Sequence, residues 1–251
     1  MTLHRLLALL EACASATPPF PPTLLYDEGW LLRLVLDWLA GHPLPGHPLG
    51  FPEGGRWFSE GLLPTAFAAR FRGDPLAEAH THADGAVGHL AVGVQARADL
   101  ALLPGATHLV VLEAKMMSPL SSGVAKAPYF DQGARSVACM AEVLHRAGRR
   151  PADLSRLGFY VLAPRSQVER GVFRRAMERG AIRGKVERRV RGYRGERDDW
   201  LRESFEPALE RMELGVMAWK EVLGAIGAQD AEAAGELEGF YRRCLEYNGR
   251  A

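Results

Sequence analysis

Two apolar runs joined by a short Pro-Gly turn constrain the fold more than any other part of the sequence. Residues 99–103 run into the turn, and residues 108–112 run back and end in Glu113 and Lys115. An apolar strand with this ending must hold a carboxylate and an ammonium at a buried edge. That is costly unless the charges are paired or bind a metal ion. The pattern therefore predicts two strands with a charged cluster at one end.

The pairing of the two runs decides which charges meet. If residues 104–108 form the connection, Asp99 lies directly opposite Glu113, and opposed Cβ atoms are about 4.5–5.5 Å apart. Lys115 follows Glu113 by two residues and therefore shares its face of the strand. A connection one residue shorter would shift the register and weaken this arrangement. We expect the first register, in which two carboxylates and an ammonium converge.

This set of groups suits phosphodiester hydrolysis with Mg²⁺ or Mn²⁺. Both ions take oxygen ligands, activate a bound water and offset the charge that develops on a phosphate. The chain has only four lysines against 27 arginines, so a lysine kept at the end of an apolar strand indicates that a compact ammonium is needed there. The alternative is an ordinary hairpin in which Glu113 and Lys115 reach solvent.

Thirteen residues separate Asp99 from the Glu113-Ala114-Lys115 tripeptide. This spacing, at the end of an apolar strand, resembles the motif of the PD-(D/E)XK, or restriction-endonuclease-like, nuclease superfamily. The residue before Asp99 is Ala98 rather than the nominal proline of the motif. The resemblance implies that Asp99 and Glu113 are metal ligands, that the carbonyl of Ala114 supplies a further oxygen, and that Lys115 acts on the attacking water.

The residues after this tripeptide extend the resemblance. Apolar residues at helical spacing predict a helix over 129–144, and members of the superfamily often carry a Gln on this helix. Gln132 is the matching position, although no tyrosine follows it. Residues 157–163 predict the next buried strand. The resemblance implies an α/β fold with a restriction-endonuclease-like core, α-β-β-β-α-β, over residues 55–165, in which helices flank a mixed central sheet.

Many members add an acidic residue from the helix before the first core strand, and two positions compete for this role. Glu60 lies in a helix predicted from Ser59, a favourable N-cap residue, through Phe71. Glu28 opens a helix predicted over 26–39. We favour Glu60 because it lies closer to the core strands, but either acid also suits a helix N-terminus without any catalytic role.

The rest of the chain is predicted to add helices at both ends of the core. Residues 1–54 form an N-terminal helical segment, and residues 166–251 form a basic segment followed by C-terminal helices packed on the core. Helices are predicted over 3–14, 24–40, 166–179, 198–227 and 231–247, with a Pro-rich connector at 18–22 and a loop at 41–48.

The charge distribution indicates a polyanionic partner. The net charge is only +1, but residues 165–197 carry 12 Arg and Lys against four Glu. Such a segment directly after the last core strand suits contact with a phosphate backbone. The alternative is a solvated, Arg-rich surface with partial internal pairing. Nothing in the pattern indicates base reading, so sequence specificity is not predicted.

A second cluster, formed by His80, His82, Asp84 and His89, could bind zinc, since His-x-His on a strand places two imidazoles on one face. No cysteine lies near, and the glycines between these residues indicate turns. We expect a His-rich loop before the core strands, which lines the cleft if it has any functional role.

The composition indicates a cytoplasmic protein without a membrane partner. No apolar run is long enough for a transmembrane helix. The three cysteines are too few and too widely spaced for a disulfide framework. The N-terminus superficially resembles a signal peptide, but Glu11 interrupts its apolar run, so we expect a structural helix there.

Three functions from different classes remain open. The first is a Mg²⁺-dependent nuclease that cleaves nucleic acid, DNA in preference to RNA, with Asp99, Glu113, Lys115, Gln132 and Glu60 at its catalytic site. The second is a nucleic-acid-binding or assembly module that keeps the fold without cleavage. The third is a hydrolase of a small phosphorylated substrate. The C-terminal helices also offer a surface for a homodimer. We expect the first function.

Overall fold

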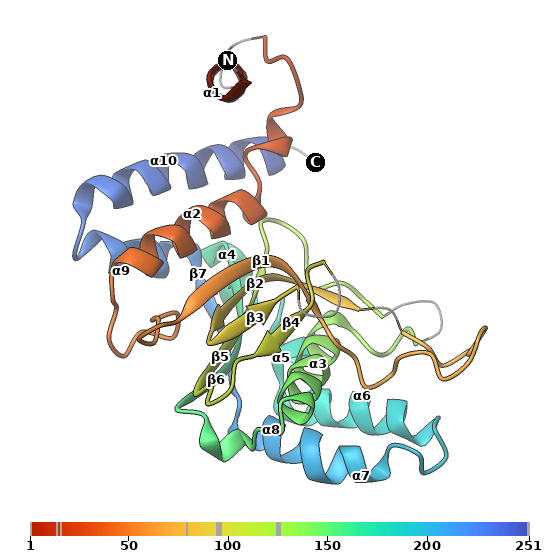
Figure 1. Cartoon of the computed structure of the whole chain (residues 1–251). Coiled ribbons are helices and arrows are strands. Elements are labelled where there is room, and N and C mark those ends of the chain that lie inside the picture. Colours follow the sequence, from red (N-terminus) through yellow and green to blue (C-terminus); the bar gives the residue numbers. More distant parts are fainter. Residues whose placement is uncertain are drawn as a thin grey trace.

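A mixed sheet of five strands lies at the centre of the molecule (Figure 1). The computed structural model describes residues 2–13, 15, 17–78, 80–93, 97–123 and 127–249. Across the sheet the strands are β1 (Arg56–Leu63), β2 (Thr81–Gly88), β5 (His108–Ala114), β6 (Arg156–Ala163) and β7 (Glu213–Ala218). β2 is antiparallel to both β1 and β5, whereas β5, β6 and β7 run parallel to one another.

The two central parallel strands consist almost entirely of buried residues. Every residue of β5 is buried, and in β6 all but the first are. A strand covered on both faces needs apolar residues at consecutive positions, and both sequences meet this requirement. The buried strands predicted at 108–113 and 157–163 are therefore confirmed.

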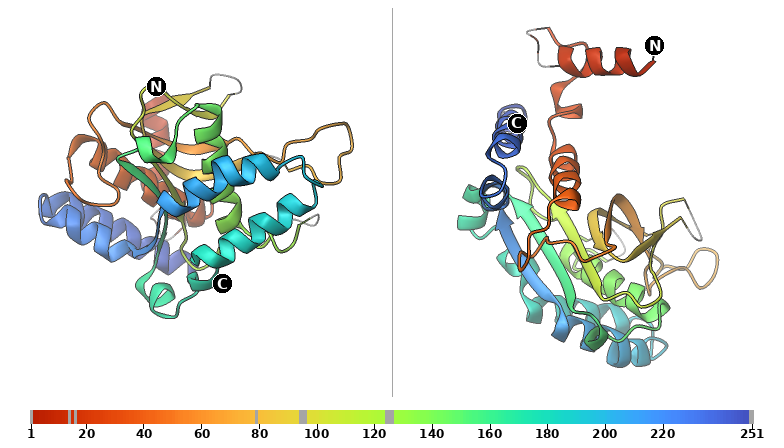
Figure 2. Two further views of the ribbon diagram at one scale, coloured as in Figure 1. Left: turned by 90° about the horizontal axis from the view of Figure 1, so that it is seen from below. Right: turned by 60° about the vertical axis from the view of Figure 1, so that its left-hand side comes forward.

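Helices cover both faces of the sheet (Figures 1 and 2). One face, here called the α2 face, packs against α2 (Glu28–Gly41), α9 (Trp219–Gly227) and α10 (Ala231–Asn248). The opposite face, here called the α3 face, packs against α3 (Gln132–Arg146), α6 (Arg179–Arg191) and α8 (Glu206–Arg211). The N-caps Asp27 and Asp131 each accept a backbone hydrogen bond at the start of α2 and α3.

The remaining helical elements are short or lie at the edge of the molecule. They are α1 (Thr2–Ala12), η1 (Pro22–Leu24), η2 (Pro151–Asp153), α4 (Arg165–Glu169), α5 (Arg174–Met177), α7 (Asp198–Trp200) and a π-helical turn, η3 (Leu201–Phe205). α1 lies apart from both helical layers (Figure 2). None of the helices in the described ranges is long and apolar enough to cross a membrane.

A small second sheet is inserted in the sequence between β2 and β5. It pairs β3 (Leu90–Val92) with β4 (Leu100–Leu102), and its leucines join the core on the α3 face. The predicted pairing of Asp99 with Glu113 is therefore wrong. Both edges of β5 are already hydrogen-bonded, one to β2 and the other to β6, so β4 has no edge of β5 to pair with.

Two predicted helices contain strands instead. The helix expected from Ser59 through Phe71 is wrong, because residues 56–63 form β1 and a loop follows. The helix expected over 198–227 is interrupted by β7 at the edge of the sheet. The boundary predicted at 54 would separate α2 from the sheet that it covers. The boundary predicted at 165 would separate β7 from the sheet in which it is the last strand.

Other predicted helices are found close to their expected positions. They are α1, α2, α3 and α10. The helix expected over 166–179 is divided into α4 and α5, and α6 follows within the basic segment. The fold is thus mixed α/β, with a five-stranded mixed sheet between two helical layers.

Candidate functional site

Glu113 is a fully buried carboxylate at the end of β5. Gln132 and Ser136, one turn apart on α3, both donate to it. Gln132 Nε2 lies 2.5 Å from Glu113 Oε2, and Ser136 Oγ lies 3.3 Å from Oε1. The other end of the Gln132 amide accepts a hydrogen bond from the backbone N–H of Ser121 at 3.0 Å. α3 and the segment before it therefore hold Glu113 in one orientation.

The ammonium of Lys115 lies between two carboxylates. Its Nζ is 3.5 Å from Oε2 of Glu113 and 3.5 Å from Oδ2 of Asp84. The Lys115 backbone is fixed as well, because its N–H donates to Leu162 O and its carbonyl accepts from Trp219 Nε1. The Lys115 side chain is only 12% exposed, so its charge acts on the two acids with little screening.

Asp84 reaches this position from the middle of β2. The β2–β5 register pairs Gly85 with Leu112, and continuing it by one residue places Asp84 opposite Glu113. Oδ2 of Asp84 also accepts the backbone N–H of Ala114 at 2.8 Å. The N–H and C=O of one strand residue point to the same edge, so the Ala114 carbonyl faces the Asp84 side of β5.

Burial raises the pKa of Glu113 well above its ordinary value of 4.5, and the negative charge of Asp84 raises it further, while Lys115 opposes the shift. Glu28, at the start of α2, also has a pKa raised mainly by burial, and it interacts electrostatically with Lys115 and Asp84. Two acids thus contact the single ammonium and a third interacts with it electrostatically, so the formal charge of the four groups is −2 when all are ionised. Such a cluster favours the binding of a further cation.

The structure brings together some of the predicted site residues and separates others. Lys115 and Gln132, two of the predicted site residues, both contact a third, Glu113. Asp99 lies elsewhere, bridged to Leu62 of β1, so both β1 and β2 stand between it and β5. The carboxylate that takes the position expected for Asp99 belongs to Asp84.

Sequence reasoning missed Asp84 because it assigned residues 80–89 to a His-rich loop. The glycines that suggested turns serve close packing in β2. A Cβ on Gly85 would lie 3.0 Å from side-chain atoms of Leu32 and Leu36 of α2, and a Cβ on Gly88 would lie 2.1 Å from the carbonyl oxygen of His108. The signal that could have revealed the strand is the run of small residues around Asp84, which suits a strand under a closely packed helix.

Glu60 lies near this cluster without joining it. The β1–β2 register places Glu60 across from Asp84, between the pairs formed by its two neighbours. Its backbone, however, has a φ of +58°, a conformation that is rare for residues other than glycine. Its carboxylate lies 3.2 Å from Arg33 and 3.9 Å from His82, and the side chain is 53% exposed. Glu28, the competing position, is the acid that interacts with Asp84 and Lys115.

The alternative zinc cluster does not converge. His82 points to Glu60, whereas the ring of His89 contacts the carbonyl of Glu53 and the N–H of Thr107. Within the described ranges, no three side chains of His, Cys, Asp or Glu are grouped closely enough to hold a metal ion.

The oxygen atoms around Lys115 nevertheless fit a hard divalent cation. Mg²⁺ is commonly held by one or two carboxylates and keeps several waters, rather than being enclosed by protein ligands. Asp84 and Glu113 supply two carboxylates on neighbouring strands, and the Ala114 carbonyl faces the same space. No nitrogen or sulfur ligand is present in this set, so the donor chemistry favours Mg²⁺ or Mn²⁺ over zinc.

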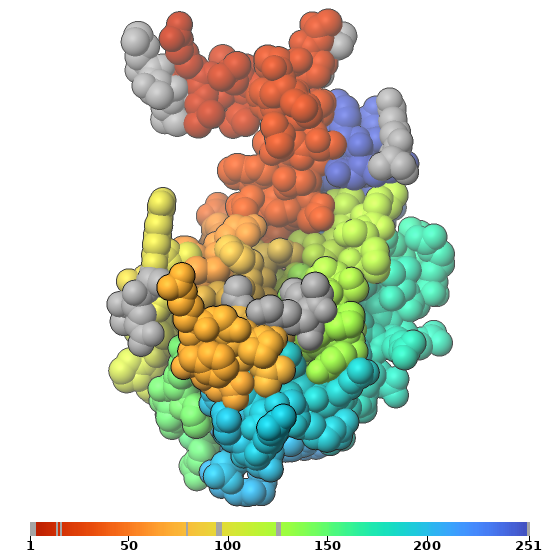
Figure 3. Space-filling model, turned by 90° about the vertical axis from the view of Figure 1, so that its right-hand side faces the viewer, coloured from red at the N-terminus to blue at the C-terminus, as the bar shows by residue number. Residues whose placement is uncertain are grey.

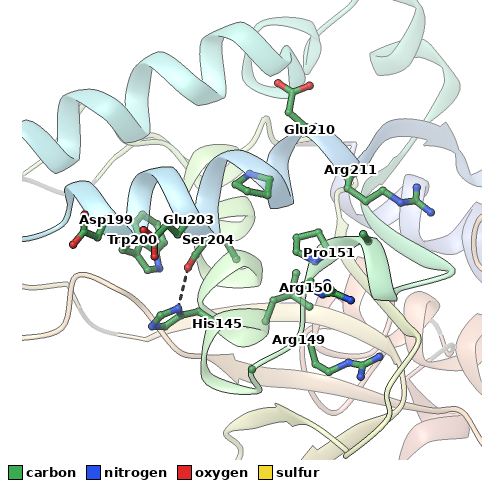
Figure 4. A pocket seen from close by; sticks show the side chains of 15 residues that line it. His145, Arg149, Arg150, Pro151, Asp199, Trp200, Glu203, Ser204, Glu210 and Arg211 are labelled. Atoms are coloured by element: carbon green, nitrogen blue, oxygen red, sulfur yellow. Dashed lines mark hydrogen bonds between the residues drawn. The ribbon is translucent and has the colours of Figure 1, made fainter.

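A cavity of about 870 Å³ lies at a distance from this cluster (Figure 4). It is bordered by the C-terminal half of α3, the following connection, and the segment from α7 to α8. Its first residue on α3 is Ala141, which lies about 13 Å along the helix axis from Gln132. At its rim Ser204 Oγ and His145 Nδ1 are 2.9 Å apart. None of the residues around Glu113 lines this cavity.

No protein-family model, no curated protein and no solved structure matches this chain. The function is therefore inferred from the sequence and the structure of this chain.

Proposed function

We propose that this protein is a divalent-metal-dependent phosphodiesterase that cleaves nucleic acid, with DNA the favoured polymer. One observation carries the proposal. A fully buried glutamate, Glu113, shares the ammonium of Lys115 with Asp84 at the end of a central strand. Since burial of an ionised carboxylate is costly, a functional requirement for the charge accounts for its presence there.

The order of elements around this cluster supports the same proposal. α2, β1, β2, β5, α3 and β6 follow one another as α-β-β-β-α-β once the small β3–β4 sheet is treated as an insertion. This is the order expected from the resemblance to the PD-(D/E)XK superfamily. Asp84 then replaces Asp99 as the first acid of the motif, and Glu28 is the acid on the helix before the first strand.

Each side chain has a distinct task in this proposal. Asp84, Glu113 and the carbonyl of Ala114 would hold the metal ion, which when bound supplies an activated water and positive charge for the phosphate. Gln132 and Ser136 orient the Glu113 carboxylate. The Lys115 ammonium lies within reach of both acids, where it can orient the attacking water and stabilise negative charge on the phosphate.

The basic segment supports a polyanionic substrate. α4, α5 and α6 lie within residues 165–197, which carry the excess of 12 basic over four acidic residues. Several of their arginines are exposed, including Arg174, Arg175, Arg188 and Arg191. Exposed arginines suit contact with phosphates and make binding sensitive to salt.

The proposal is tested by incubating the purified protein with supercoiled DNA, linear DNA and RNA in Mg²⁺, Mn²⁺ or chelator. Cleavage that requires a divalent ion is expected, and nicking as against end-trimming separates endonuclease from exonuclease activity. Glu113→Gln should abolish cleavage because a neutral amide is a poor metal ligand.

Glu142→Gln is the matched control. Glu142 is another buried carboxylate, but it lies further along α3 and pairs with Arg146. This variant should cut like the wild type. Binding of nucleic acid without cleavage in every metal would instead support a non-cleaving module, and turnover of nucleotides alone would support a hydrolase of small substrates.

A further inference from the structure

The loop between β1 and β2, residues 64–78 and here called the Phe71 loop, protrudes at the end of the sheet that carries the proposed site. β2 is antiparallel to β5, so the start of β2, where the loop ends, lies beside the end of β5 that carries Glu113. Figure 3 shows this loop in the middle of one face, directly above the basic segment and beside residues that follow β5. The loop therefore borders the approach to Glu113.

The tip of the Phe71 loop is held by a buried carboxylate. Asp74 is 1% exposed and accepts the backbone N–H groups of Arg70 and Leu76, at 3.2 and 2.9 Å. The guanidinium of Arg70 closes the same ring, with Nε 2.8 Å and Nη2 3.1 Å from Asp74. Arg70 also contacts Glu196 at 2.8 Å and lies over the ring of Tyr193. The tip is thus ordered before any ligand binds.

The base of the loop is connected to the proposed site. Phe67 packs edge-on against Phe130, with ring centroids 5.6 Å apart. Phe130 precedes Gln132 by two residues, and Gln132 holds Glu113. On the other side, Tyr193 Oη donates to the carbonyl of Leu76 at 2.6 Å. The loop is therefore fixed to the residues just before α3 and to the turn that follows α6.

The tip presents an aromatic ring within a cationic surface. Phe71 is 58% exposed, and its neighbour Arg72 is exposed as well. The helix and turn against which the loop rests expose Arg188, Arg191 and Arg194. Within the described chain, none of these four arginines forms an ion pair with a carboxylate. A single exposed aromatic residue is ordinary. Here, however, the ring lies 5.6 Å from the Arg70 guanidinium, and these exposed arginines, without a carboxylate partner in the described chain, lie on the same loop and on the adjoining helix and turn. This combination suits a base and its phosphates.

We propose that Phe71 stacks on an unpaired base, and that the substrate is therefore single-stranded nucleic acid or a duplex with a single-stranded flank. Inside an intact duplex the faces of the bases are covered by their neighbours, so along a strand it is an unpaired base that can offer its face to Phe71. Arg72, the next residue in the chain, is exposed as well and would contact the phosphate backbone of the same strand. This inference rests on the proposed function, because it names the substrate of the same site.

The test measures binding in the presence of chelator, where no cleavage occurs. The probes are a fluorescently labelled oligothymidine of about 16 nucleotides and a duplex of equal length, followed by anisotropy. Phe71→Ala should weaken binding of the single strand by about 5- to 100-fold and change duplex binding little. Phe71→Trp should bind the single strand about as tightly as the wild type, because it keeps an aromatic stacking surface. Arg72→Ala should weaken the binding of both probes. It should also lower, by about one, the slope of the logarithm of the binding constant against the logarithm of the salt concentration.

Leu24→Ala is the matched control, since Leu24 is 63% exposed but lies in η1, before α2. It should bind both probes like the wild type. Equal affinity of Phe71→Ala and wild type for the single strand would overturn the inference. An equal loss on both probes would do the same, because it would show a purely electrostatic surface.

The outcome is separable from that of the proposed function. If the wild type never cuts but binding of the single strand depends on Phe71, the proposed function fails and the stacking contact stands. If the wild type cuts and Phe71→Ala cuts and binds single strands equally well, the nuclease proposal stands and the stacking contact fails.

Discussion

Asp84 and Asp99 are two aspartates that precede β5 in the sequence, but only Asp84 reaches the cluster around Glu113. Asp84 lies within β2, and Asp99 directly precedes β4. Asp84 meets Lys115 and the backbone of Ala114, whereas Asp99 is bridged to Leu62 at the far side of β1. The strand that is nearer in sequence is not the neighbour in the sheet.

The difference lies in the inserted β3–β4 sheet. It returns the chain to β5 without occupying either edge of that strand, so the edge is left for β2. An acid can therefore be close to Glu113 in space while nearly 30 residues away in sequence, and an acid half as far away can be excluded. Which charges meet at this site therefore depends on the order of the strands in the sheet and not on distance along the sequence.

The sharpest test of this comparison replaces each aspartate by its neutral isostere. Asp84→Asn should lower the cleavage rate by about 10³-fold, since metal binding contributes several kcal/mol to stabilising the transition state. Asp99→Asn should cut at a rate near that of the wild type. Rates are measured on DNA in Mg²⁺, with circular dichroism to verify folding. The reverse ranking would restore the pairing that the sequence suggested.

The two competing glutamates extend the comparison to the helix before the sheet. Glu28→Gln should lower the cleavage rate by about 10- to 100-fold, because Glu28 supports the charge balance around Lys115 and Asp84. Glu60→Gln should have a smaller effect, because Glu60 is committed to Arg33 and His82. The cleavage rates of both variants are measured at several Mg²⁺ concentrations. A role in metal binding shifts the Mg²⁺ concentration at which the rate is half-maximal. A larger shift for Glu60→Gln would assign the third acid to β1.

Glu113 also makes a prediction about stability without metal. Its pKa is raised by burial, so the folded state favours the protonated form, and stability is lost as pH rises above the ordinary value of 4.5 through the raised pKa. Glu113→Gln removes this titration. In chelator, the variant should therefore lose less thermal stability than the wild type between pH 5 and pH 8. Parallel curves for the two proteins would mean that Glu113 is ionised at little cost.

His108, at the opposite end of β5, gives the smallest expected effect, and here stability falls as pH decreases rather than as it increases. Within the described chain, Nε2 of His108 is buried without a hydrogen-bond partner, and burial lowers the pKa of His108 from 6.5 to about 4. The unfolded chain takes up a proton first as pH falls, so the folded state loses stability between pH 6.5 and 4. His108→Leu should remove about 1–2 kcal/mol of the loss between pH 7 and pH 5, measured by urea unfolding. An unchanged pH dependence would assign acid sensitivity to other groups.

The sequence allowed accurate prediction where local pattern and burial agree. β5 and β6 are continuous apolar runs, and α3 has a clear apolar face and the N-cap Asp131. These elements place Glu113, Lys115 and Gln132, which were predicted to act together, and both Lys115 and Gln132 contact Glu113. The roles proposed for these residues in cleavage remain predictions.

The errors have different physical causes. Ser59 is a good helix N-cap, but residues 56–63 pair with β2, and this pairing overrides the local preference. The stretch that contains β7 has apolar residues at spacings that also suit a helix. No proline or glycine stands at either boundary of β7, where α8 ends and where α9 begins. Asp84 was missed because the glycines of β2 resemble turn residues until the helix packed over them is known.

Gln132 joins the site to the chain segment around Ser121. Its carbonyl oxygen is occupied by the N–H of Ser121, so its amide can present only N–H groups to Glu113. Ser121 also accepts the backbone N–H of Gln132, which makes the link reciprocal. A displacement of the segment around Ser121, for instance by an arriving strand of substrate, would consequently move the Gln132 amide and with it the hydrogen bond to the Glu113 carboxylate. The entry of substrate past this segment would therefore change the orientation of Glu113, the proposed metal ligand.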